Sequence, residues 1–72
     1  MNDKTAVDAL LQDLPEVLTV AEVAELMRVD ASTVGQWAKD YGLTVITIGP
    51  RTRRIRLEDL REFLLHSDEH HD

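Results

Sequence analysis

Two start signals for short helices, one helix length apart, constrain the fold of this chain more than any other feature. In "LTVAEVAELM", Thr19 and Glu22 have the spacing of a capping box, in which each side chain bonds to the other's backbone amide. The "RVD" stretch then breaks the pattern. Asp30 is a suitable N-cap for "ASTVGQWAKD", and Gly42 supplies the residue that commonly ends a helix. The pattern predicts a helix over about 20–27 and a second helix after a tight turn.

The apolar residues of this helix pair have the spacing of two helices that cross. Ala24 lies where the second helix would come closest, and a small side chain is needed there because the crossing is steep. The positions that would then face the core are all apolar: Val23, Met27, Val29, Val34 and Trp37. A plain helical hairpin in a small core would show some of these matches, so the spacing alone leaves both interpretations open.

After Leu43 the pattern changes from helical to extended. "TVITI" is almost wholly β-branched, "GP" interrupts it, and "RRIRL" alternates basic with apolar residues, which predicts a β-hairpin with its tip near 49–52. We expect Ile46, Ile48 and Ile55 to anchor this hairpin. "LEDLREFLL" then predicts an amphipathic helix over about 57–65. The expected fold class is therefore α+β.

The two ends of the chain are harder to interpret. A helix over about 5–14, capped by Asp3 or Thr5 and ended by Pro15, could pack on the domain or on a partner, or could fray. We divide the chain into an acidic segment, 1–17, a domain, 18–65, and an acidic, histidine-containing tail, 66–72, expected to be disordered. His66 and His70 could chelate a metal only if the last helix extended through the tail, so we expect no metal site.

Composition excludes several classes of protein. The chain has 72 residues and no cysteine, so it forms one small domain without disulfides or thiolate zinc sites. No apolar run approaches the roughly 18–20 residues that span a membrane, and the acidic N-terminus has the wrong sign for a signal peptide. No arrangement of catalytic side chains stands out. We expect a cytoplasmic protein that is not an enzyme, has no cofactor and does not enter a membrane.

The net charge of −6 is unevenly distributed. One basic residue against four acidic ones gives residues 1–17 a charge of −3, and one against six gives residues 57–72 a charge of −5. Between them, six basic residues against four acidic ones give 18–56 a charge of +2. Four of the eight basic residues fall in "VITIGPRTRRIR". An acidic total is therefore compatible with a local cationic surface that binds nucleic acid.

Together, the helix pair, the hairpin and the last helix describe a winged helix-turn-helix. "LTVAEVAELMRVDASTVGQWAKDYGL" followed by "TIGPRTRRIRLEDLREFL" resembles the small MerR-type winged helices of phage excisionases, also called recombination directionality factors. The resemblance covers residues 18 to 65, and the run "R-x-R-R-x-R-x-x-D-L-x-x-F-L" is its most specific part. It implies binding to double-stranded DNA, with the second helix in a major groove and the wing at a neighbouring minor groove or backbone. It also implies DNA bending and two kinds of protein partner, a site-specific integrase and further copies of the chain.

The candidate DNA contacts divide between the second helix and the wing. Gln36 can bond adenine in a bidentate way, and Gly35 offers no side chain for reading bases. Arg51 and Arg53, near the tip, suit a minor groove. The full set of expected contacts is Arg28, Ser32, Thr33, Gln36, Lys39, Arg51, Arg53, Arg54 and Arg56. We expect Trp37 to pack in the core rather than stack on a base, while Tyr41 suits either the core rim or a phosphate contact.

Three other functions are compatible with parts of the pattern. A transcriptional regulator that binds promoter DNA would use the same winged helix. The charged hairpin could be only a solvated sheet edge that discourages aggregation. The acidic ends could belong to a protein-interaction module that contacts a basic partner or mimics DNA, although a cationic wing is unsuited to a mimic.

Overall fold

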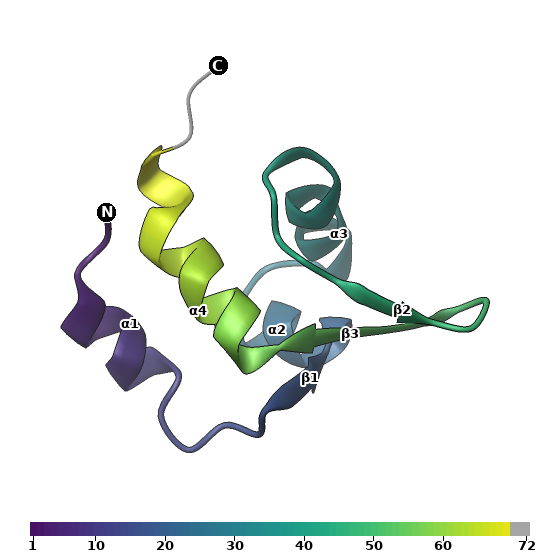
Figure 1. The fold of residues 1–72 in the computed structure, drawn as a ribbon, viewed down its shortest axis with the longest axis horizontal. Helices are drawn as coiled ribbons and strands as arrows, with labels where there is room; N and C mark the ends of the chain where they lie inside the picture. The colour runs from purple at the N-terminus through teal and green to yellow at the C-terminus, as the bar shows by residue number, and fades with distance from the viewer. Residues whose placement is uncertain (70–72) are drawn as a thin grey trace.

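A computed structural model describes residues 1–69 and shows the helices gathered at one end of a small antiparallel sheet, from which the hairpin extends to the right (Figure 1). The sheet has the strand order β1-β3-β2. The elements in chain order are α1 Lys4–Leu10, β1 Val17–Thr19, α2 Val20–Met27, α3 Ala31–Asp40, β2 Ile46–Ile48, β3 Thr52–Arg56, α4 Leu57–His66 and a 3-10 turn, η1, Ser67–Glu69. The α+β winged helix-turn-helix predicted from the sequence is confirmed.

The helix pair α2–α3 forms where the start signals predict it. The Thr19 hydroxyl accepts a hydrogen bond from the Glu22 amide (2.9 Å), and the Glu22 carboxylate accepts one from the Thr19 amide (2.8 Å). Asp30 occupies the N-cap position of α3, as predicted, although its side chain makes no capping hydrogen bond. At the other side of the turn, Arg28 ends α2 in a left-handed conformation, and the Val29 amide donates to the Ala24 carbonyl at 2.9 Å. The turn is thus closed mainly by backbone bonds.

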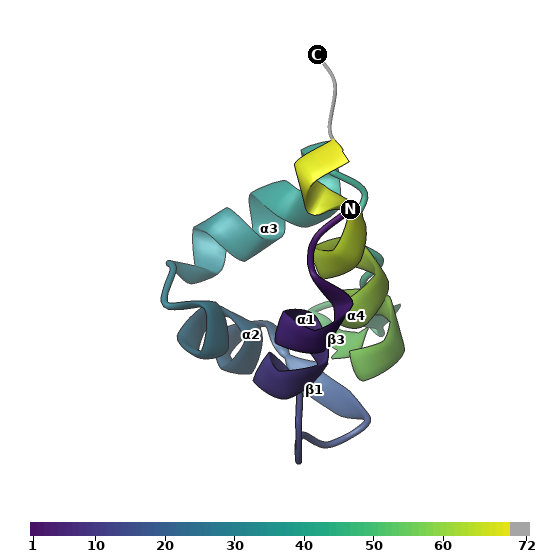
Figure 2. The ribbon, with the colours of Figure 1, turned by 90° about the vertical axis from the view of Figure 1, so that its left-hand side faces the viewer.

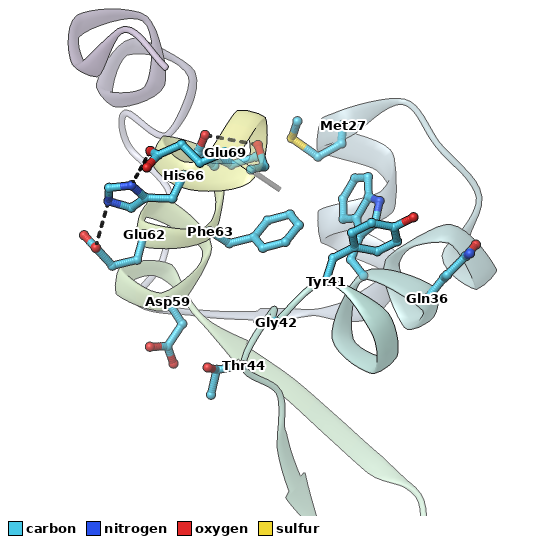
Figure 3. Close-up of a pocket in the computed structure, with 13 residues that line it drawn as sticks. Met27, Gln36, Tyr41, Gly42, Thr44, Asp59, Glu62, Phe63, His66 and Glu69 are labelled. Carbon is cyan, nitrogen blue, oxygen red and sulfur yellow. Dashed lines mark hydrogen bonds and ion pairs between the residues drawn. The ribbon is translucent and has the colours of Figure 1, made fainter. Parts of the chain in front are cut away.

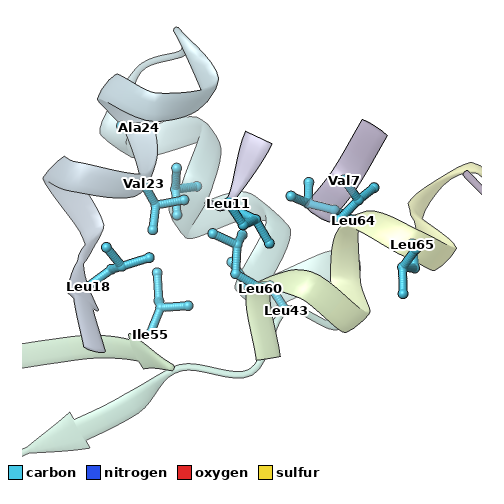
Figure 4. Close-up of a cluster of buried hydrophobic side chains, with 11 residues drawn as sticks. Val7, Leu11, Leu18, Val23, Ala24, Leu43, Ile55, Leu60, Leu64 and Leu65 are labelled. Atoms are coloured by element: carbon cyan, nitrogen blue, oxygen red, sulfur yellow. The ribbon is translucent and has the colours of Figure 1, made fainter. Parts of the chain in front are cut away.

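All helices contribute to one apolar core (Figure 4). The four largest fully buried side chains are Ile55, Leu60, Val23 and Val34. Ala24 is buried beside them, as expected for the position where α2 and α3 meet. Met27, Val29 and Trp37 are partly buried and pack against this cluster, as the helix-crossing pattern predicts.

The sheet contains a strand that the sequence pattern did not reveal. β1 pairs antiparallel with β3, placing Leu18 opposite Ile55, and the Leu57 amide donates to the Glu16 carbonyl at 2.7 Å. β2 is shorter than "TVITI". Ile46 and Ile48 are 40% and 56% exposed, so the expectation that they anchor the hairpin in the core is wrong for both and right only for Ile55. Ile55 therefore anchors the hairpin in the core, and β2 is held by its pairing with β3.

The N-terminal helix packs on the domain rather than fraying. Val7 and Leu11 are buried in the common core, and the Asn2 amide donates to the Leu65 carbonyl of α4 at 2.7 Å. Figure 2 shows α1 lying in front of α4. The helix ends at Leu10, well before Pro15, and Asp13 then adopts a positive φ of 63°. The predicted end at residue 14 is therefore wrong.

The C-terminal end is ordered further than expected. α4 continues to His66, and the Met1 amine lies 3.3 Å from a carboxylate oxygen of each of Asp68 and Glu69, which both belong to η1. Disorder is thus the wrong expectation for 66–69, while 70–72, including the His70 of the metal hypothesis, lie outside the described residues. Within 1–69, no cluster of three metal-binding side chains forms, and no helix is long and apolar enough to cross a membrane.

Candidate nucleic-acid interface

The side of α3 that faces away from the core is polar. Val34 is fully buried, whereas Ser32, Gln36 and Lys39 are exposed and Thr33 is partly exposed. The N-terminal half of α3 therefore presents two hydroxyls and an amide, next to backbone amides whose dipoles favour phosphate. These groups can hold a backbone and read one or two bases, but they offer no charged side chain until Lys39.

Gly35 lies on α3 among these polar residues. A Cβ built at Gly35 would meet no atom within 4 Å, so the packing of the protein itself does not require glycine. The absence of a side chain leaves a smooth patch on the outer surface of α3. Base recognition by this helix is consequently limited to its few hydroxyl and amide groups.

The wing presents arginines that have no acidic partner. The turn at its tip contains Gly49 with a φ of +66°, and Arg51 and Arg53 beside it are exposed. Arg54 is partly buried and donates from Nη1 to the Arg53 carbonyl oxygen at 2.8 Å. No carboxylate of residues 1–69 lies within ion-pair distance of any of these three guanidinium groups. Their positive charge is available to phosphates.

Arg56 differs from the other wing arginines. Its guanidinium makes two hydrogen bonds to the Asp59 carboxylate, from Nε at 2.8 Å and from Nη2 at 3.0 Å, and lies 4.0 Å from Glu58. These bonds raise the pKa of Arg56 and lower the pKa of Asp59. Arg56 therefore joins the end of β3 to the first turn of α4, and its charge is largely compensated within the protein.

The remaining predicted positions lie around this surface. Arg28 is exposed at the end of α2, and no carboxylate in the described part of the chain pairs with it. Trp37 stacks at a tilt against Phe63, with ring centroids 5.5 Å apart, and packs against the core as expected. Tyr41 is 44% exposed and follows the end of α3, a position compatible with both the core rim and a phosphate contact.

Charge is segregated in space as well as in sequence. In Figure 1 the wing extends to the right beside α3, while α1 and α4 lie on the left. Segment 1–17, with a charge of −3, and segment 57–69, with one basic residue against five acidic ones and so a charge of −4, lie mainly on the left, and the cationic wing extends to the right. DNA approaching the wing and α3 would thus avoid most of the negative charge.

Comparison with known proteins agrees with this geometry. A family model described as a helix-turn-helix domain matches residues 17–67, from β1 to the 3-10 turn. The chain belongs to this helix-turn-helix domain family. No curated protein and no solved structure gives a significant match. As a member of this family, the chain is a small DNA-binding helix-turn-helix protein whose partner is double-stranded DNA, and α1 lies outside the matched region.

Proposed function

We propose that this helix-turn-helix protein acts as an excisionase-type factor. It would bind double-stranded DNA near a prophage attachment site, bend it, and direct an integrase toward excision from within the bacterial cytoplasm, without a catalytic step of its own. The observation that carries the DNA-binding part is the unpaired guanidinium groups of Arg51, Arg53 and Arg54 beside the polar face of α3. The excisionase part is supported by the resemblance of the "RTRRIRLEDLREFL" stretch to that family.

We expect α3 and the wing to make different contributions to DNA binding. Ser32, Thr33 and Gln36 would set the register in a major groove, and the arginines would supply most of the affinity at the neighbouring backbone or minor groove. If Arg28, Lys39 and the three unpaired wing arginines each neutralise one phosphate, log affinity falls with log salt at a slope of about −4.5. Such binding by one copy is weak at physiological salt, which is why the proposal includes further copies or an integrase as partners.

Replacing Arg51, Arg53 and Arg54 together by alanine tests the DNA-binding surface. We expect the salt slope, measured by anisotropy of a labelled duplex, to become shallower by about 2.7, because three phosphate contacts are lost. The same test can be made with single substitutions such as Arg51→Ala. Their control is Lys4→Ala, which removes one exposed cation from α1, opposite the wing. An unchanged slope in the triple variant would contradict the proposed surface.

A transcriptional regulator would use the same DNA-binding surface, but it would act at a promoter rather than with an integrase. Excision and integration assays with the cognate integrase separate the two functions. We expect added protein to stimulate excision and the triple arginine variant to lose that stimulation. If neither direction responds although DNA binds, the excisionase role is wrong and a promoter-binding regulator replaces it.

A further inference from the structure

Two isoleucines of the wing lie outside the core. Ile46 and Ile48 of β2 are 40% and 56% exposed, and Ile48 is more exposed than any other large apolar residue in 1–69 except the terminal Met1. The wing leaves the helices at Thr44, beside the pocket between α3 and α4, and its two strands then run away from both helices (Figure 3). The helices of the described chain therefore leave these two side chains largely in solvent.

Both isoleucines share a face of the wing with Arg54. In the hairpin register Ile46 lies opposite Arg54, and Ile48 follows two residues later on the same strand. Residues paired across antiparallel strands, and residues two apart along one strand, project from the same face of a sheet. Ile55, which follows Arg54 in β3, is fully buried and so projects from the other face into the core. The outer face of the wing thus places two apolar side chains beside a guanidinium group.

The fold itself does not require isoleucine at these two positions. A strand favours β-branched side chains, and Thr47, between the two isoleucines, shows that a polar one serves β2 as well. β2 is also an edge strand, where exposed apolar side chains promote aggregation. Ile46 and Ile48 are thus apolar side chains that the fold neither buries nor needs, and they are available for contact with another molecule.

The charges around the isoleucines indicate that this molecule is DNA. Arg51 and Arg53 at the tip are exposed and, like Arg54, have no carboxylate of 1–69 within ion-pair distance. Unpaired guanidinium groups suit the minor groove, whose negative potential is enhanced where it is narrow. Proteins that enter the minor groove frequently insert an apolar side chain such as isoleucine between two base pairs, which unstacks them and kinks the duplex. The wing carries both kinds of side chain.

From this arrangement we propose that Ile48 inserts between two base pairs in the minor groove and bends the DNA there, while Ile46 packs against the sugars beside it. Arg51, Arg53 and Arg54 hold the wing to the flanking phosphates. This inference rests on the proposed contact between the wing and DNA, and it adds the residue that produces the bend. It also predicts where the bend occurs, because pyrimidine–purine steps such as TA unstack most easily.

Two duplexes of equal length and base composition test this inference without knowledge of the target sequence. An alternating duplex of dA and dT contains TA steps throughout, whereas a duplex of a dA strand with a dT strand contains none and has a narrow minor groove. Arginines alone favour the narrow groove, and an inserted side chain favours the TA step. We expect the protein to bind the alternating duplex at least about fivefold more tightly, measured by anisotropy. Equal affinities, or tighter binding of the other duplex, overturn the proposal.

Ile48→Thr removes the inserted side chain and keeps the β-branching that the strand favours. We expect this variant to lose the preference for the alternating duplex but to keep the salt slope of the wild type, because no phosphate contact is lost. The rise in fluorescence of 2-aminopurine, placed at TA steps to report unstacking, should disappear as well. Unchanged duplex preference and fluorescence overturn the proposal, and Ile48→Ala repeats the test if threonine disturbs the hairpin.

Val17→Thr is the matched control. Val17 is 50% exposed and lies on β1, at the opposite edge of the sheet from β2, so its replacement should change neither the duplex preference nor the fluorescence. Sedimentation of the free proteins tests a different occupant of the apolar face. If Ile48→Thr reduced self-association and left the duplex preference unchanged, contact between copies would replace insertion into DNA.

The triple arginine variant separates this inference from the proposed function. If loss of Arg51, Arg53 and Arg54 makes the salt slope shallower but Ile48→Thr leaves the duplex preference unchanged, the wing binds DNA and only the insertion is wrong. If the triple variant leaves the slope unchanged, the wing does not contact DNA, and both the proposed surface and the insertion are wrong.

Discussion

Gly35→Ala should stabilise the protein, because glycine at this position serves neither packing nor backbone conformation. Gly35 lies inside α3 with no positive φ, and a Cβ there would meet nothing within 4 Å. The free energy of unfolding should therefore rise by the full difference in helix propensity between glycine and alanine, about 1 kcal/mol. For a domain of this size, that corresponds to a rise in Tm of roughly 4–8 °C.

Gly42→Ala is the matched control in a thermal melt followed by far-UV circular dichroism. A Cβ at Gly42 also meets no atom within 4 Å, but its φ is +83°. An L-residue in that conformation costs about 1 kcal/mol, so this variant should melt at a lower temperature. The two substitutions differ in backbone conformation rather than in space. If Gly35→Ala also lowered the Tm, the helical conformation and the open surface assigned to Gly35 would both be in doubt.

The same position tests whether α3 faces DNA. Gly35→Arg adds one cation to the exposed surface of α3, which should raise affinity roughly eightfold at about 0.1 M salt and steepen the salt slope by about 0.9. Ala6→Arg adds the same charge on α1, on the other side of the molecule, and should leave the slope unchanged. If both substitutions changed the affinity and the salt slope equally, DNA binding would depend only on the net charge of the protein, and α3 would make no specific contact with DNA.

Three further substitutions or conditions test the structure. Leu11→Ala should lower the free energy of unfolding, measured with urea, by about 2–3 kcal/mol, because Leu11 is buried. Leu10→Ala is the control and should lower it much less, because Leu10 is 41% exposed. Arg28→Gly should raise stability by about 1 kcal/mol by relieving the left-handed conformation, yet make the salt slope of DNA binding shallower by about 0.9. Arg56 lowers the pKa of Asp59, so this pair stabilises the fold above the carboxyl's ordinary value of 3.8 and that contribution is lost as the pH falls below it. The difference in Tm between wild type and Asp59→Asn should accordingly disappear in an acid titration.

The sequence predicted the elements whose causes are local. The capping box of Thr19 and Glu22, the positive φ of Gly42 and the apolar spacing around Ala24 all act within one or two helical turns. Strand β1 depends instead on pairing with β3, far along the chain, and three residues are too few to show an alternation. The left-handed Arg28 was also missed, because nothing in an arginine marks that conformation.

The candidate site was predictable to a similar degree. Alternation in "RRIRL" places Arg54 and Arg56 on the face opposite Ile55, and the register agrees. The pairing of Arg56 with Asp59 was missed, although the two are only three residues apart across the start of α4.

The acidic N-terminal segment is held in a fixed place on the domain. Buried Val7 and Leu11 tie α1 to the core, and Arg61 Nε bonds to Asp8 at 2.7 Å, so the negative N-terminal segment is held against α4. A small cationic protein would bind DNA through any face, since phosphate contacts carry no orientation by themselves. With negative charge fixed on the side away from the wing, only one approach is favourable. The acid would therefore add selectivity of orientation at the expense of affinity, which suits the proposed function, in which one copy binds weakly and further copies or an integrase act as partners.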